Sequence, residues 1–157
     1  MKKNIIYEAS KNNIDIQCIK FVNYLEHDKH LARHKIFDLF LDSFNVNAHT
    51  SAVDSLWAGL PILTKVGNSF SSRICGSILN SLGLNNLISY SKKEYMEKAI
   101  YLGNNIDEIK KIKNLIIKSK EKNNFYDIKS YTCKLESAFA KAHELRLNNN
   151  ETVSFEV

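Results

Sequence analysis

The most constraining feature of this sequence is the alternation of short apolar runs with longer segments of helical periodicity. Three apolar runs predict buried strands, at 18–22 (CIKFV), 39–41 (LFL) and 61–64 (PILT). A further short apolar piece stands at 87–88. Strands that alternate with helices pair in parallel, and runs without polar alternation are buried on both faces. We therefore predict an α/β fold with a parallel sheet flanked by helices.

Helical spacing and end signals divide the remaining residues into helices. Gly59 and Gly83 mark the ends of two of them, because glycine is favoured just past a helix. Ser91, with Glu94 three residues later, predicts a capping box at the start of another. The predicted helices are 2–12, 27–36, 50–58 and 69–82, then one after Ser91, one with the stripe Ile106, Ile109, Ile112 and Ile116, and one with the stripe Ile128, Tyr131, Leu135, Phe139 and Ala142. Residues 1–147 are predicted to form one domain and 148–157 a polar tail.

Bulk properties exclude several classes of function. No apolar run approaches the roughly 20 residues of a membrane span, and the first residues lack a signal-peptide core. Cys18, Cys75 and Cys133 are odd in number and far apart, which predicts buried thiols in a reducing compartment and no metal site. The net charge of +5 comes from dispersed lysines, which favours solvated helix faces over a nucleic-acid interface. We predict a soluble, cytoplasmic protein without nucleic-acid or membrane partners.

The chemistry-bearing segment follows the predicted strand 39–41. Parallel sheets bind ligands beyond the carboxyl ends of their strands, and a helix N-terminus there suits phosphate. Thr50 and Ser51 add hydroxyls, His49 adds a ring N–H, and Asp54 lies one turn along the same face. The residues alone also allow a plainer interpretation, in which Thr50 or Ser51 caps the helix and Asp54 is an exposed acid.

Apolar residues on the same helix, and a second loop, complete this region. Val53, Leu56 and Trp57 have helical spacing and are predicted to lie in the core. In the loop KVGNSFSSR, Gly67 permits a tight turn and Ser69 is a candidate cap for the next helix. This loop repeats, after the predicted strand 61–64, the arrangement of a strand, a polar loop and a helix start.

The stretch DLFLDSFNVNAHTSAVDSLWAGLPILT resembles the catalytic-domain signature of the protein O-GlcNAc transferase and SPINDLY-like glycosyltransferases. Further matches in register are HLARHKIFDLFLD, KVGNSFSSRICGSILNSLGLNNLI and FYDIKSYTCKLESAF. The resemblance covers residues from about Asn4 to Leu145. It implies a Rossmann-like fold, equivalent to most of the C-terminal, nucleotide-sugar-binding lobe of a two-lobed enzyme.

The resemblance also implies a site for a UDP-sugar such as UDP-N-acetylglucosamine. His49, Thr50 and Ser51 match residues that hold the diphosphate, and Asp54 matches the acid that binds the ribose. In addition, His30 and Arg33 match residues that contact the uridine, and Asn47 belongs to the same binding segment. The family requires no metal or other cofactor, because the UDP-sugar is itself the donor substrate.

The sequence departs from the family pattern in its loop residues and in how much of the family's catalytic domain it covers. Ser51 replaces a threonine but keeps the hydroxyl, whereas Asn45 and Val46 replace Pro–Tyr, and Val66 and Asn68 replace Pro and Glu. We expect the chain to begin inside the second lobe and to lack the first lobe, its catalytic base and any tetratricopeptide array. No catalytic residue is therefore assigned.

Two functions follow from the resemblance and from this expected extent. The first is the donor-binding lobe of a protein O-linked glycosyltransferase, which transfers a sugar from UDP to a protein hydroxyl. A second polypeptide with the N-terminal lobe is then a candidate partner, and the chain alone is expected to be inactive. The alternative is a non-catalytic remnant, or one half of a split enzyme, that acts as an interaction module.

Overall fold

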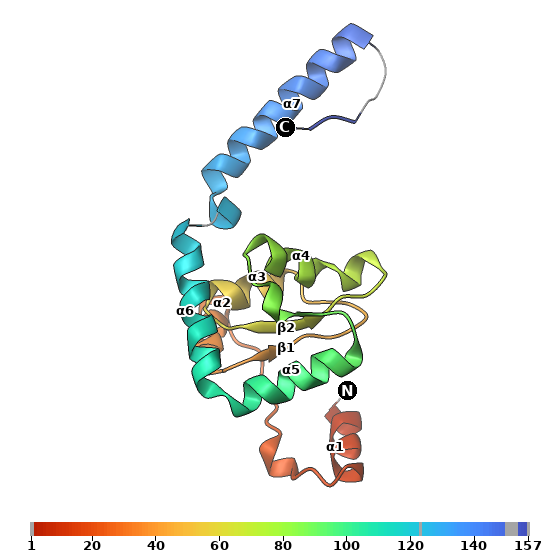
Figure 1. Cartoon of the computed structure of the whole chain (residues 1–157), viewed down its shortest axis with the longest axis vertical. Helices are drawn as coiled ribbons and strands as arrows, with labels where there is room; N and C mark the ends of the chain where they lie inside the picture. The colour runs from red at the N-terminus through yellow and green to blue at the C-terminus, as the bar shows by residue number, and fades with distance from the viewer. Residues whose placement is uncertain (1, 123, 150–153, 157) are drawn as a thin grey trace.

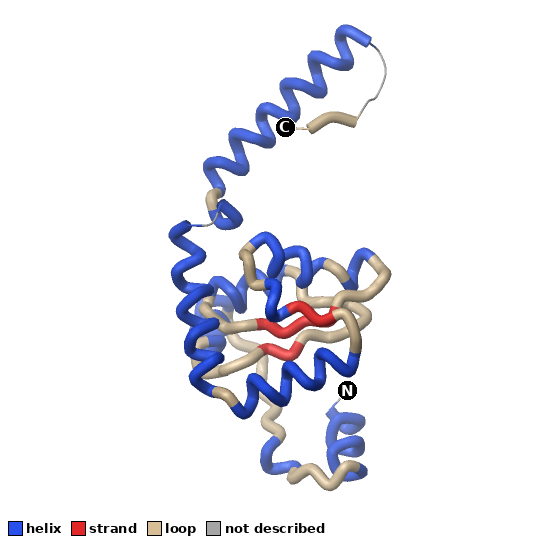
Figure 2. The backbone as a smooth tube through the Cα atoms, viewed as in Figure 1, coloured by secondary structure: helices blue, strands red, loops and turns tan. Residues whose placement is uncertain are grey.

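The computed structural model describes residues 2–122, 124–149 and 154–156. Its centre is a three-stranded parallel sheet in the order β1-β2-β3 (Figure 2). The strands are β1 (Phe40–Leu41), β2 (Ile62–Lys65) and β3 (Ile88–Ser89). Leu41 is in register with Leu63, and Thr64 with Ile88, so β2 pairs with β1 along its first half and with β3 along its second. The α/β prediction is confirmed.

Helices surround this sheet, with α3 and α4 above it and α5 below it in the view of Figure 1. The two predicted glycine ends are confirmed, because Gly59 and Gly83 both have positive φ, at 87° and 73°. The predicted helix 69–82 is interrupted, since it begins as a 3₁₀ turn and becomes α-helical only after Arg73. The α-helices are α1 (Lys2–Lys11), α2 (His27–His34), α3 (Thr50–Trp57), α4 (Ile74–Ser81), α5 (Lys92–Asn104), α6 (Ile106–Lys122) and α7 (Ile128–Asn149), and the 3₁₀ helices are η1 (Ile16–Cys18), η2 (Phe70–Ser72), η3 (Asn85–Leu87) and η4 (Asn124–Tyr126).

The predicted strand at 18–22 is wrong. Asp15 accepts a hydrogen bond from the Gln17 N–H at 2.9 Å and caps η1, so the chain turns where the strand was expected to begin. Residues 19–26 then run without regular structure. The third strand is β3, which the sequence shows only as the short apolar piece at 87–88. Without a neighbouring strand to supply hydrogen bonds, an apolar run does not become part of a sheet.

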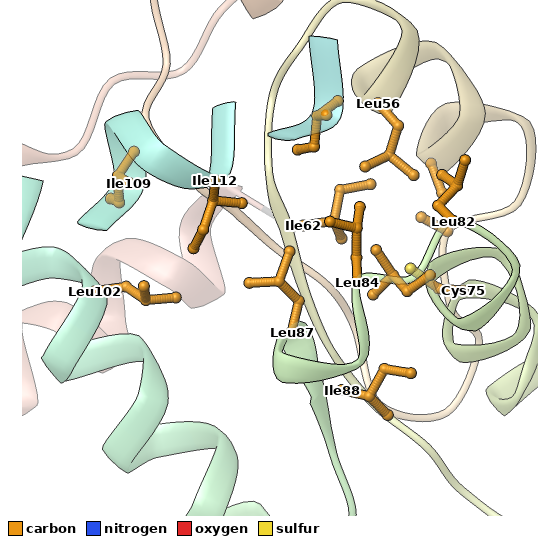
Figure 3. Close-up of a cluster of buried hydrophobic side chains, with 14 residues drawn as sticks. Leu56, Ile62, Cys75, Leu82, Leu84, Leu87, Ile88, Leu102, Ile109 and Ile112 are labelled. Atoms are coloured by element: carbon orange, nitrogen blue, oxygen red, sulfur yellow. The ribbon is translucent and has the colours of Figure 1, made fainter. Parts of the chain in front are cut away.

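The core lies between the sheet and helices α3 to α6 (Figure 3). The isoleucine stripe of α6 packs there through Ile109, Ile112 and Ile116, whereas Ile106 at the helix start is exposed. On α3, Leu56 is buried as predicted, whereas Val53 is only half-buried and does not belong to the core cluster. Trp57 is 51% exposed, so its prediction is wrong. Its ring instead forms a T-shaped contact with Tyr126 at 5.2 Å between centroids.

The two ends of the described chain lie away from this core. Figure 1 shows α7 extending from one side of the body and α1 lying on the opposite side. The predicted stripe of α7 is exposed, with Ile128 at 79% and Phe139 at 65%. The prediction of buried thiols holds for Cys75 but is wrong for Cys18 and Cys133, because η1 and α7 leave both in solvent.

The C-terminal residues and the membrane criterion complete the description. Residues 148 and 149 of the predicted tail belong to α7, and 150–153 and 157 lie outside the described residues. None of the helices that the structure describes is both long enough and apolar enough to cross a membrane.

Candidate functional site

Asp42 organises the loop that follows β1. It is buried, and its Oδ1 accepts hydrogen bonds from the N–H groups of Ser43 and Ala48, both at 2.8 Å. Its Oδ2 accepts a bond from the Thr64 hydroxyl at 2.6 Å, which ties the loop to β2. The Asp42 carbonyl also accepts a bond from the Tyr95 hydroxyl of α5 at 3.1 Å. Asp42 therefore holds the polar loop against the carboxyl edge of the sheet, a role that the motif comparison did not assign.

Asn47, a predicted ligand-binding residue, lies inside this loop. Its side chain is buried, and its Nδ2 donates to the Ser43 carbonyl at 2.8 Å. The Asn47 N–H donates to the Ser71 carbonyl at 2.9 Å, which joins the loop to the segment after β2. Its Oδ1 is buried without a hydrogen-bond partner among the described residues. This geometry gives Asn47 a part in shaping the loop.

The loop ends at the N-terminus of α3. His49 precedes the helix and is exposed, and its carbonyl accepts the N–H groups of Ala52 and Val53 at 2.9 and 3.3 Å. The plainer interpretation, in which Thr50 or Ser51 caps the helix, is wrong because both lie within α3. Their side chains are exposed, and no hydrogen bond within the described part of the chain involves either hydroxyl or either N–H. These donors are free to meet an anion at the positive end of the helix.

Helix α2 lies beside α3 and presents a connected set of polar side chains. Arg33 donates from Nη1 to the Asn23 carbonyl at 3.0 Å and from Nη2 to His30 Nδ1 at 2.6 Å. His34 Nδ1 lies 2.8 Å from the His30 carbonyl oxygen, and the two imidazoles meet edge to face with centroids 4.5 Å apart. The rings of His30 and His34 are therefore held by contacts within the helix.

The electrostatic surroundings of His30 favour its neutral form. Burial lowers the pKa of His30, and the charges of His34 and Arg33 lower it further. The carboxylate of Asp54 on α3 opposes them and raises that pKa. Helix α2, which carries His30 and Arg33, packs against helix α3, which carries Asp54.

A pocket of about 270 Å³ adjoins this group. Its polar wall is formed by His30, Arg33 and His34, and its apolar wall includes Val22, Leu39 and Leu41. Among the residues that the structure describes, no three His, Cys, Asp or Glu side chains gather in a way that would hold a metal ion. The site therefore offers an apolar slot beside the imidazoles of His30 and His34 and the guanidinium of Arg33. Asp54 and the hydroxyls of Thr50 and Ser51 belong to the neighbouring helix α3.

Comparison with known proteins gives a consistent result. The profile of glycosyl transferase family 41 matches residues 2–135. The chain is 29% identical over 126 residues to a UDP-N-acetylglucosamine–peptide N-acetylglucosaminyltransferase of Caenorhabditis elegans, an alignment that covers 80% of this chain and 11% of the relative. It is 27% identical over 150 residues to the probable UDP-N-acetylglucosamine–peptide N-acetylglucosaminyltransferase SEC of Arabidopsis thaliana, covering 95% of this chain and 15% of that protein.

A solved structure shares the fold. A mutant of the O-GlcNAc transferase of Thermobaculum terrenum superposes with a TM-score of 0.81 at 22% sequence identity. The superposition covers 88% of this chain and 27% of that one. At this identity the likeness concerns the fold alone. The present chain spans 11% and 15% of the length of the two curated relatives described above.

Proposed function

This chain belongs to glycosyl transferase family 41, and we propose that it forms the nucleotide-sugar-binding lobe of a protein O-linked glycosyltransferase. The observation that supports this most directly is that the free donors lie at the start of α3, which packs against the helix that carries His30 and Arg33. Both sets of side chains lie on the α2–α3 side of the sheet. The order of these side chains matches the order of groups in a nucleoside diphosphate. The donors face the anionic diphosphate, the Asp54 carboxylate the ribose, and the apolar pocket the planar base.

The diphosphate is assigned to the start of α3. Thr50 and Ser51 contribute two N–H groups and two hydroxyls that the described fold leaves unused. Hydrogen bonds to a charged acceptor are stronger than neutral ones, at about 1.5–3 kcal/mol each. His49, exposed at the same helix end, is assigned to the same anion. In sugar transfer, these donors would stabilise the charge that develops on the UDP leaving group.

The nucleoside is assigned to the pocket beside α2. The Asp54 carboxylate is an acceptor suited to ribose hydroxyls, and Arg33 and His30 provide N–H donors for a pyrimidine edge. Val22, Leu39 and Leu41 supply the apolar surface on which the base can pack. Asn47 acts on this site indirectly, because its hydrogen bonds hold the loop that leads to His49.

The proposal assigns donor binding to this chain and leaves proton transfer to other groups. The printed names of the two relatives describe transfer of N-acetylglucosamine to a peptide, and we extend that donor and a protein acceptor to this chain. A second polypeptide with the complementary lobe is part of the proposal. A cytoplasmic location stays a prediction, which microscopy of a tagged chain would test.

One observation favours a second candidate function, an interaction module. The apolar stripe of α7 is exposed, and no strand within the described ranges pairs with the outer edge of β1. A donor-binding lobe and an interaction module can share these features. They differ in whether the chain binds nucleotide.

Isothermal titration of the purified chain with UDP separates the two candidates. We expect saturable binding in the millimolar to high micromolar range, which corresponds to roughly 4–5.5 kcal/mol. Cytidine and guanosine diphosphates serve as controls, because the pocket beside His30 should favour one base over the others. Absence of any saturable heat with UDP at millimolar concentrations would leave the interaction module as the better account.

A further inference from the structure

A second polar pocket opens at the carboxyl ends of β2 and β3. Its volume is about 460 Å³, and its wall includes Phe44, Asn45, Lys65, Ser69 and Tyr90. It shares no lining residue with the pocket beside His30, and none of its lining residues belongs to α3. The proposed donor site lies towards β1, whereas this pocket lies towards β3.

Lys65 lines this pocket, and Lys92, which is not among the lining residues, lies near the ring of Phe44, which is. The ammonium groups of Lys65 and Lys92 lie 5.7 and 5.9 Å from the centroid of the Phe44 ring. That ring is itself held by a T-shaped contact with Tyr95, with centroids 5.0 Å apart. Within the described parts of the chain, neither lysine lies within ion-pair distance of a carboxylate. Lys65 Nζ donates one hydrogen bond to the Val66 carbonyl at 3.1 Å, which leaves its other N–H groups for a ligand, and the charges of both lysines lack a carboxylate partner there.

The acids near this pocket do not compete for the lysines. Glu94 accepts a hydrogen bond from the Tyr90 N–H at 2.8 Å and pairs with Lys98 at 2.9 Å. Both carboxylate oxygens of Asp42 are occupied by hydrogen bonds from the loop and from Thr64. None of the residues that line the pocket is acidic. Lys65 is therefore the one charged residue in the described lining of the pocket.

The floor of the pocket is built by a rigid turn. Ser69 and Ser72 form a reciprocal capping box, in which the Ser69 N–H donates to the Ser72 hydroxyl at 3.1 Å. A Cβ atom on Gly67 would lie 2.5 Å from the Ser72 Oγ, so only glycine allows this close approach. Asn45 and Asn68 border the pocket with exposed side chains that can donate hydrogen bonds. The pocket thus combines a fixed floor with free donors at its rim.

We propose that this pocket binds the phosphate group of a small phosphate monoester. A phosphate monoester has a charge of about −1.5 to −2 at neutral pH, which matches two lysines better than a single carboxylate does. The volume falls within the usual range for small-molecule sites and exceeds that of phosphate alone. The organic part of the ligand would contact Tyr90 and the carboxamides of Asn45 and Asn68. Such a ligand would occupy the sheet edge beside the proposed donor.

Isothermal titration with glucose 6-phosphate at constant ionic strength tests this proposal. We expect the parent to bind glucose 6-phosphate more tightly than inorganic phosphate and not to bind glucose. The double variant Lys65→Met and Lys92→Met should weaken binding by at least about tenfold. Lys110→Met, which removes an exposed lysine of α6, should have no effect. Circular dichroism verifies that the variants are folded. The single variant Lys92→Met changes an exposed side chain and should weaken glucose 6-phosphate binding several-fold.

Equal binding by the parent and by Lys92→Met, or no saturable binding of glucose 6-phosphate, would overturn the proposal. Its failure is distinguishable from failure of the donor site. Replacing Thr50 and Ser51 by alanine should leave glucose 6-phosphate binding unchanged. Conversely, if that double variant lost glucose 6-phosphate, the ligand would occupy the start of α3 and the second pocket would be refuted.

Discussion

Arg33 donates a hydrogen bond from Nη2 to His30 Nδ1 at 2.6 Å, and this contact sets the protonation state of the histidine. A guanidinium group can only donate, so Nδ1 must supply a lone pair. His30 is then the neutral tautomer with its proton on Nε2. That N–H is the donor that the proposed nucleoside site requires.

The first prediction concerns the titration of His30. NMR should give His30 a pKa below its ordinary value of 6.5, because burial and then the charges of His34 and Arg33 disfavour the imidazolium. Arg33→Gln should raise the pKa of His30, and Asp54→Asn should lower it further. Lys29→Gln on the same helix is the control. A His30 pKa at or above 6.5 in the parent would contradict the assigned tautomer.

The same shift makes the stability of the protein dependent on pH. The pKa of His30 is lower in the folded state than in the unfolded chain, so the unfolded state binds more protons in the window just below pH 6.5. The contribution of His30 to the unfolding free energy is therefore complete above pH 6.5 and decreases as the pH falls. Urea unfolding at several pH values should show a weaker acid dependence for His30→Asn. An unchanged dependence would remove His30 as its source.

A second prediction tests the role of Asp42. An asparagine offers one carbonyl oxygen where the carboxylate offers two acceptors for Ser43, Ala48 and Thr64. A buried donor left without an acceptor costs about 1–3 kcal/mol, and we expect Asp42→Asn to lower the unfolding free energy by that amount. Asp107→Asn, at an exposed acid of α6, should change it by less than about 0.5 kcal/mol. Equal stability of the two variants in urea would refute the anchoring role.

The third prediction concerns thiol reactivity. Burial raises the pKa of Cys75 to about 12, whereas Cys18 and Cys133 are exposed. Alkylation proceeds through the thiolate, so Cys75 should resist iodoacetamide in the folded protein and react after denaturation. Mass spectrometry of the digested protein identifies the labelled positions. Labelling of all three at one rate would contradict the packing of α4.

A fourth prediction is that the chain associates with itself or with another polypeptide. The outer edge of β1 has no paired strand in the described part of the chain, and Leu41 on it is 55% exposed. Unpaired edges and exposed apolar faces favour association. Light scattering over a concentration series should detect it. A monodisperse, cooperatively melting monomer would exclude this behaviour.

A matched pair of variants locates the surface responsible. Tyr131→Lys together with Phe139→Lys removes two aromatic side chains from the exposed stripe of α7 and should reduce association. Lys129→Gln, also on α7, changes one exposed charge and should not. If both variants associate as the parent does, the edge of β1 is the surface to test next.

Much of the fold could be predicted from the sequence, because local signals and tertiary packing agree there. Helix α5 begins directly after Ser91, as predicted. The Ser91 hydroxyl caps the helix by accepting a hydrogen bond from the Glu94 N–H at 3.1 Å. The wrong predictions occur where contacts with other parts of the fold, and not the local sequence, determine the structure. The run at 18–22 is apolar but has no strand beside it, and β3 is too short to show a period of its own. Trp57 follows the core spacing of α3 yet lies at the margin of the body.

The candidate site shows the same division. The residue types at the start of α3 predicted an anion site, but His30 and Arg33 were found only through the family resemblance, because exposed His and Arg are common. Asp42 could have been noticed as an acid directly after a buried strand. The pocket lined by Lys65 and Tyr90 could not be predicted, because it joins loops that are distant in the sequence.

The central claim is that the start of α3 binds the diphosphate of a UDP-sugar, and titration of UDP into matched variants tests it most directly. Replacing Thr50 and Ser51 by alanine removes two hydroxyl donors to a charged group, and Asp54→Asn removes the carboxylate assigned to the ribose. Each should weaken UDP binding by about tenfold or more. Ser77→Ala, at an exposed serine of α4, should bind UDP as the parent does. UDP binding by the Thr50 and Ser51 double variant that equals the parent's would contradict the claim.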